Sequence, residues 1–204
     1  MKPQEIAKPV QLLVEGENPR GFFEALLLHL GLAEAVQVQN FGGVDGLRGF
    51  TKALARTPGI ATIEAIGCIR DAEAAAPAAP QSVRHAFRAA GWPEPEEAGL
   101  VAGRQPRVGL FLLPGSGRPG MLETLCWEAV SEDPAAPCVG SFMECLGERR
   151  IEVRNPDKAK VQAFLASREA VDGRVGIAAR KGYWPFHSQA FSPLKNFVTA
   201  LVGP

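Results

Sequence analysis

The chain has 204 residues, of which 46% are hydrophobic and 22% are charged, a composition typical of a soluble globular protein. The 22 Lys and Arg balance the 22 Asp and Glu, so no overall charge draws the protein toward nucleic acid or a membrane surface. The amino terminus has no apolar signal segment and no run approaches the ~20 apolar residues of a membrane span, so we expect a cytoplasmic protein without membrane attachment.

Apolar periodicity, interrupted by Gly and Pro, predicts alternating strands and helices. In chain order we expect a strand at 10–16, a helix at 18–30, a strand at 36–41, a helix at 45–54, a strand within 62–73, a helix at 82–90, a strand at 108–113, helices at 121–130 and 138–147, an edge strand at 149–153, a helix from 157 and a helix at 193–201. We expect Asn18, Asp45 and Ser82 to cap the first three helices.

This order of elements suits right-handed crossovers and a parallel sheet. We therefore expect the α/β class, as a single domain with a central, mostly parallel sheet of about four strands between helices. Its core would span about 8–130, followed by a carboxy-terminal extension at about 131–204. The four Cys lack metal-site spacing, and Cys68 and Cys126 lie in apolar elements, which predicts buried free thiols.

The stretch 62–73 is the most informative part of the chain. It is apolar and β-branched up to Ile69, typical of a strand buried on both faces, and then becomes acidic at Asp71 and Glu73. In an extended chain these two carboxylates point to the same side, at the sheet edge where open α/β sheets bind ligands. A divalent cation is the usual partner of such a pair.

Four acids follow strands of the predicted sheet or open the next helix: Glu15, Asp71, Glu73 and Glu123. Parallel strands end at one edge, so these carboxylates can converge, and they repel one another unless a cation neutralises them. Mg²⁺ or Mn²⁺ would do so. Alternatively, Glu15 and Glu123 are acids favoured by helix dipoles, and Asp71 is a turn residue.

The pattern resembles the Toprim domain, and more closely the small stand-alone Toprim-like proteins of prokaryotes, relatives of the Toprim half of the overcoming-lysogenisation-defect nucleases. The resemblance covers nearly the whole chain and rests on 12–16, 22–23, 42–43, 71–73, 120–123, 158–161 and 181–186. It implies that Glu15 is an acid/base glutamate and that Asp71, Glu73 and Glu123 bind metal. Glu73 stands where the family usually has Asp, and the charge of the preceding Arg70 can compete with a cation.

The function that the acids and the resemblance imply is Mg²⁺-dependent phosphodiester chemistry on DNA or RNA. Lys181 or Lys160 would stabilise charge on a transition-state phosphate, and Arg118 would lie near phosphate. A partner ATPase acting in trans and a homodimer are both open at this point.

Two other functions remain open. One is a non-catalytic Toprim-like module that binds a nucleotide, nucleic acid or protein partner, which net neutrality, Arg70 and Glu73 favour. The other is nucleotide binding by the loop at 115–120, which fits the dinucleotide pattern but follows the fourth strand and contains Pro119. The aromatic loop at 183–187 is either a hydrophobic plug or a platform for bases.

Overall fold

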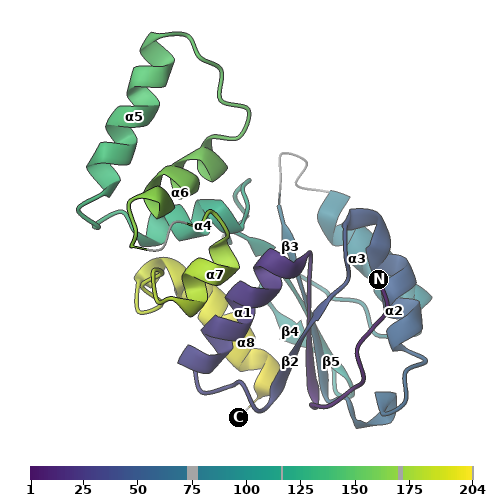
Figure 1. The fold of residues 1–204 in the computed structure, drawn as a ribbon. Helices are drawn as coiled ribbons and strands as arrows, with labels where there is room; N and C mark the ends of the chain where they lie inside the picture. The colour runs from purple at the N-terminus through teal and green to yellow at the C-terminus, as the bar shows by residue number, and fades with distance from the viewer. Residues whose placement is uncertain (73–77, 116, 170–171, 204) are drawn as a thin grey trace.

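The computed structural model describes residues 1–72, 78–115, 117–169 and 172–203, and it shows a central sheet between two layers of helices (Figure 1). The five strands, in the order β2-β1-β3-β5-β4 across the sheet, are β1 Val10–Val14, β2 Val36–Asn40, β3 Ala65–Asp71, β4 Val101–Ala102 and β5 Arg107–Leu113. Neighbouring strands among β1, β2, β3 and β5 pair in parallel, while β4 is an antiparallel edge of two residues. The predicted α/β class and mostly parallel sheet are confirmed.

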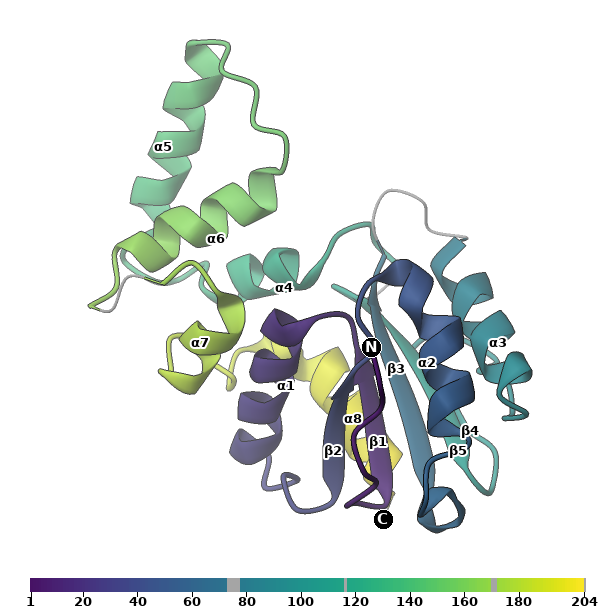
Figure 2. The same cartoon turned by 45° about the vertical axis from the view of Figure 1, so that its right-hand side comes forward.

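Helices cover both faces of the sheet. They are α1 Glu17–His29, α2 Leu47–Leu54, α3 Ala78–Ala89, α4 Leu122–Ala129, α5 Ala136–Glu148, α6 Pro156–Ala166, α7 Val175–Arg180 and α8 Ser192–Val202. Helices α1 and α8 lie on one face and α2 and α3 on the other, whereas α5 and α6 extend beyond the sheet as an arm (Figures 1 and 2). No helix within the described ranges is long and apolar enough to cross a membrane.

The alternating side chains of β1 show how the two layers are held. Leu12 and Val14 enter a core shared with α1 and α8, whereas Leu13 enters the core formed with α2 and α3. Strand β3 is buried from Ala65 to Arg70, as predicted for a strand covered on both faces. Gly67 allows α8 to cross the sheet closely, because a Cβ there would lie 2.4 Å from Leu201 Cδ1.

The carboxy-terminal third returns to the core. Side chains of α6, α8 and the aromatic loop pack in the same cluster as Phe22 of α1. Trp184 is 2% exposed, stacks on Phe164 and donates its indole N–H to the carbonyl of Val175 at 2.8 Å. The aromatic loop is therefore a hydrophobic plug, with Phe186 also buried.

Four local predictions were wrong. Helix α1 begins at Glu17, and Asn18 instead accepts a hydrogen bond from the Gly176 N–H at 2.9 Å, which ties α7 to α1. Asp45 lies in a short 3₁₀ turn, Val44–Gly46, and α3 begins four residues before Ser82, so neither residue is a cap. Residues 149–153 form no strand, because they connect α5 to α6 on the arm, away from both sheet edges.

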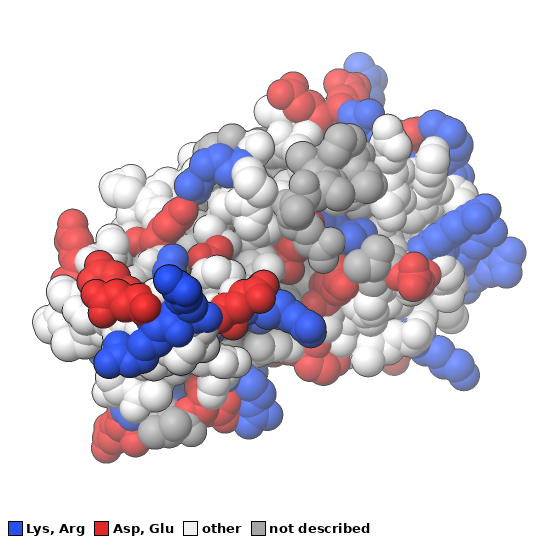
Figure 3. Space-filling view, turned by 90° about the horizontal axis from the view of Figure 1, so that it is seen from above, with Lys and Arg blue, Asp and Glu red and all other residues white. Residues whose placement is uncertain are grey.

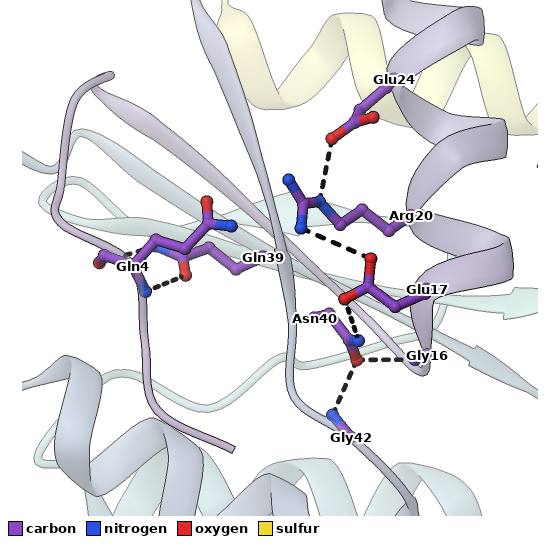
Figure 4. Close-up of polar contacts among 8 residues, drawn as sticks. All are labelled: Gln4, Gly16, Glu17, Arg20, Glu24, Gln39, Asn40 and Gly42. Carbon is purple, nitrogen blue, oxygen red and sulfur yellow. Dashed lines mark hydrogen bonds and ion pairs between the residues drawn. The ribbon is translucent and has the colours of Figure 1, made fainter. Parts of the chain in front are cut away.

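The first eight residues cross the outer part of the sheet and are held by glutamine side chains. Gln39 accepts a hydrogen bond from the Gln4 N–H at 2.9 Å (Figure 4). It also donates one to Gln11 Oε1 at 2.9 Å. Gln11 and Gln39 are fully buried, so these bonds supply the partners that buried amides require.

Candidate functional site

Three of the four predicted acids are described, and they occupy the carboxyl edge of the parallel strands. Glu15 directly follows β1, Asp71 ends β3, and Glu123 lies in the first turn of α4. The fourth acid, Glu73, lies outside the described residues. Seen from above, the protein shows Lys and Arg side chains interspersed with Asp and Glu (Figure 3).

Asp71 lies at the centre of this group. Its Oδ1 accepts a hydrogen bond from the backbone N–H of Leu122, the first residue of α4, at 3.0 Å. Burial and then the charge of Glu123 raise the pKa of the Asp71 carboxyl to about 7, and the charge of Glu15 acts in the same direction. The Leu122 N–H and the charge of Lys158 lower this pKa only in part. The charges of Glu123 and Glu15, both remote in sequence, thus act on the Asp71 carboxyl.

Glu15 is paired with Arg70. Arg70 Nε lies 3.2 Å from Glu15 Oε2, and the side chain of Arg70 is only 5% exposed. Leu13 of β1 pairs with Cys68 of β3, so two residues further along Glu15 falls beside Arg70 on the same face. Arg70 therefore meets Glu15, whereas alternation turns it away from the adjacent Asp71.

Cys68 lies two residues before Arg70 in β3, and its thiol is fully buried. Burial raises the pKa of its thiol to about 12, and Arg70 offsets this effect only in part. All four cysteines are free; Cys68 and Cys126 are buried as predicted, and Cys138 and Cys145 are exposed.

A second cation beside the acids, besides Arg70, is Lys158, which sequence reasoning did not single out. Its Nζ lies 3.9 Å from Glu123 Oε1, and its charge also acts on Asp71. The start of α6 is tied to α4 because Thr124 Oγ1 donates to Asp157 Oδ2 at 2.5 Å. The only sequence signal was the position of Lys158 within a stretch that resembles the Toprim-like proteins.

The three predicted cationic residues have other partners or neighbours. Arg118 makes a two-bond pair with Glu128 at 2.8 and 3.0 Å. Lys160 lies 3.7 Å from Asp157 Oδ1 and 5.9 Å from the centre of the Trp127 ring. Lys181 is exposed after the end of α7, where its charge acts on Asp172. None of the three is among the groups that shift the pKa of Asp71.

Asn40, the last residue of β2, holds the backbone next to Glu15. Its Oδ1 accepts hydrogen bonds from the N–H groups of Gly16 and Gly42, both at 2.8 Å, and its Nδ2 donates to Glu17 Oε1 at 2.8 Å (Figure 4). Gly16 has φ of +99°, a conformation that glycine adopts without a steric penalty. The signal in the sequence was a polar residue ending a buried strand.

Asn40→Ala is expected to destabilise the protein by about 2–3 kcal/mol, because two backbone N–H groups lose their acceptor at a site that is 7% exposed. Urea unfolding monitored by circular dichroism measures this loss. Glu17→Ala is the control, since it removes the acceptor of Nδ2 and a long, exposed contact with Arg20 at 3.5 Å, and should cost less than 1 kcal/mol. Equal losses in both variants would contradict the role given to the Gly16 and Gly42 bonds.

The chemistry of these acids suits a divalent cation, but the side chains of the described ones are not arranged around one point. They supply carboxylate oxygens, the ligands that Mg²⁺ prefers, and their mutual repulsion is what a cation would relieve. In the described part of the chain, however, no three His, Cys, Asp or Glu side chains are grouped to hold one ion. The pairing of Glu15 with Arg70 accounts for this in part, because Glu15 is drawn to the guanidinium.

Comparisons with known proteins give one family and one similar solved protein. Three crystal structures of the "C-terminal region of the Xanthomonas campestris pv. campestris OLD protein", phased with iodine, mercury and platinum, are similar to this chain. Identities are 18%, 18% and 16%, TM-scores are 0.41, 0.42 and 0.42, and each match covers 96% of this chain and 90%, 91% and 88% of the other. The sequence resemblance pointed to the OLD proteins as well. No curated protein matches the sequence. Residues 9–203 match the family described as "Protein of unknown function (DUF3226)", and the chain belongs to that family.

Proposed function

We propose that this protein binds Mg²⁺ or Mn²⁺ at the carboxyl edge of its sheet and carries out phosphodiester chemistry on nucleic acid. The observation that supports this most is the raised pKa of Asp71, produced by burial, Glu123 and Glu15 at one sheet edge. A buried carboxyl surrounded by like charges at a ligand-binding edge is typical of functional sites. In this proposal Asp71 and Glu123 hold the metal together with Glu73, and Glu15 is the general acid/base.

Each described residue has a defined part in the proposal. The Leu122 N–H orients Asp71, and Arg70 orients Glu15. Lys158 lies beside Glu123 and is better placed than Lys160 or Lys181 to stabilise negative charge on a phosphate near the acids. When bound, the metal would neutralise phosphate charge and lower the pKa of a coordinated water.

Calorimetric titration of Mn²⁺ into the wild type and Asp71→Ala tests metal binding, and labelled single- and double-stranded DNA and RNA test cleavage. We expect the wild type to bind in the micromolar to millimolar range, and Asp71→Ala to lose binding and at least 100-fold of any cleavage rate. Asp172→Ala, which removes a half-buried acid paired with Arg174, is the matched control and should behave as wild type. Absence of both binding at millimolar Mn²⁺ and cleavage by the wild type would remove the proposal.

The second candidate is a non-catalytic module that binds a nucleotide, nucleic acid or protein. The specific observation in its favour is Arg70, whose buried guanidinium supplies a fixed positive charge to Glu15 at the place where a catalytic site needs a free acid. Nucleic-acid affinity that is the same in EDTA and in Asp71→Ala, without cleavage, would select this candidate.

A further inference from the structure

Helix α5 exposes an apolar stripe on the outer side of the arm. Its inner residues Ala136 and Val139 are buried, and the helix packs against α6. Cys138, Phe142 and Cys145 are spaced by four and three residues, so they share one face, and all three are exposed. Phe142 is 48% exposed. Figures 1 and 2 show that the arm projects from the body of the protein, so this face is open to another molecule.

The charges of α5 are arranged against its own dipole. Its first turn contains no acid and its last turn no base, while the exposed Glu144 and Glu148 lie in its second half. Acids are favoured at helix amino termini and disfavoured at carboxyl termini. In an antiparallel neighbour of the same sequence, Glu148 would lie beside the amino-terminal end of the other helix, where it is favourable.

The flanking segments have the same complementarity. Exposed Glu132 precedes the helix, and exposed Arg149 and Arg150 follow it. Antiparallel alignment about the middle of α5 places the two arginines of one copy within about a turn of the acidic segment before α5 in the other copy. Because a two-fold axis relates the two helices, the same contact between arginines and acids forms at both ends of the pair.

We propose that α5 pairs antiparallel with α5 of a second copy of this chain, around a two-fold axis between Ser141 and Phe142. Cys138 and Cys145 are equally far from this axis along the helix. The Cys138 thiol of each copy therefore lies beside the Cys145 thiol of the other, and the two Phe142 rings cover each other at the centre.

The predicted dimer is weak. A single pair of short helices buries less than the ~1,200–2,000 Å² of a standard interface, so it forms only at high protein concentration. Its peripheral charge pairs are exposed, so added salt weakens it further. The apolar stripe lies on the arm, whereas the proposed metal site lies at the sheet edge. The two proposals can therefore fail independently.

Oxidative cross-linking tests the pairing and its direction. Within one helix, Cys138 and Cys145 are about 10.5 Å apart along the axis, too far for a disulfide, so a bond between them joins two copies. We expect copper-phenanthroline at about 100 μM protein to give a covalent dimer whose linked peptides contain Cys138 and Cys145. Cys138→Ser and Cys145→Ser should each lose the covalent dimer, whereas a mixture of the two variants should regain it with one bond per dimer. Dimers of equal yield in either single variant alone would overturn the proposal.

Sedimentation equilibrium supplies a readout that needs no cysteine chemistry. We expect Phe142→Glu to weaken self-association at least tenfold without changing the circular dichroism spectrum, because Phe142 is not part of the core. Leu28→Glu, at a residue that is 73% exposed on α1, is the matched control and should associate as wild type. A wild-type chain that stays monomeric at millimolar concentration would overturn the proposal and assign the stripe to a different protein. Association unaffected by Phe142→Glu would overturn it as well.

Discussion

Asp71→Asn is expected to stabilise the protein by about 2–4 kcal/mol at pH 8 and by almost nothing at pH 4. The folded state raises the pKa of Asp71 to about 7, so folding opposes its ionisation. Below about pH 4 the carboxyl is protonated in both states and costs nothing. As the pH rises from about 4 through 7, the unfolded state ionises Asp71 more readily than the folded state, so the free energy of unfolding of the wild type falls. Asn stays neutral over this range and retains an oxygen for the Leu122 N–H. Urea unfolding at pH 4, 6 and 8 measures the difference.

Asp133→Asn is the control for this pH profile, with the opposite sign. Burial of Asp133 is outweighed by hydrogen bonds from Arg168 and the Ala135 N–H, so its pKa is lowered. The stabilisation that ionised Asp133 gives the folded state is therefore present at pH 6–8 and decreases as the pH falls through its lowered pKa. A constant gain from Asp71→Asn at every pH would show that the Asp71 carboxyl is not held against ionisation.

Added Mg²⁺ connects this profile to the proposed function. At pH 8 and 10 mM Mg²⁺, the wild type should gain stability, because a ligand that binds only the folded state stabilises it by mass action. Asp71→Asn should gain much less. An identical gain in both proteins would place any bound Mg²⁺ elsewhere.

Arg70→Met is expected to tighten Mn²⁺ binding about tenfold, which corresponds to about 1.4 kcal/mol. In the wild type, the guanidinium neutralises Glu15 at 3.2 Å, and without it a metal ion takes over that negative charge. The fold should tolerate the change. Arg70 Nε and Nη1 are buried without a hydrogen bond, and Glu15 is 31% exposed and can reach water.

Calorimetric titration of Mn²⁺ at pH 8 measures this effect. Arg88→Met is the matched control, because it also removes an arginine from an ion pair, with Glu94 at 2.6 Å, but on the exposed surface of α3. Its Mn²⁺ affinity should equal that of the wild type. Unchanged affinity in Arg70→Met would show that the charge of Glu15 does not reach the bound metal.

The sequence determined the class of fold and the edge at which the acids gather. Both follow from local patterns: β3 is apolar enough to be buried on two faces, and Asp71 comes where that pattern ends. The helix faces were equally readable, since Leu194, Phe197, Val198 and Leu201 of α8 repeat with helical period and are all buried. Parallel strands end on one edge, so order alone was sufficient to bring Glu15 and Glu123 toward Asp71.

Only the tertiary structure decided what each charge meets. Arg70 contacts Glu15 because the register of β1 against β3 places them side by side, and neither strand encodes that register by itself. Lys158 reaches Glu123 because α6 is anchored on α4 across more than thirty residues of sequence. Asn18 bonds to Gly176 in place of capping its helix because α7, six residues long and without a clear periodicity, packs on α1. Such contacts join segments that are remote in the chain, so their partners become defined only when the core closes.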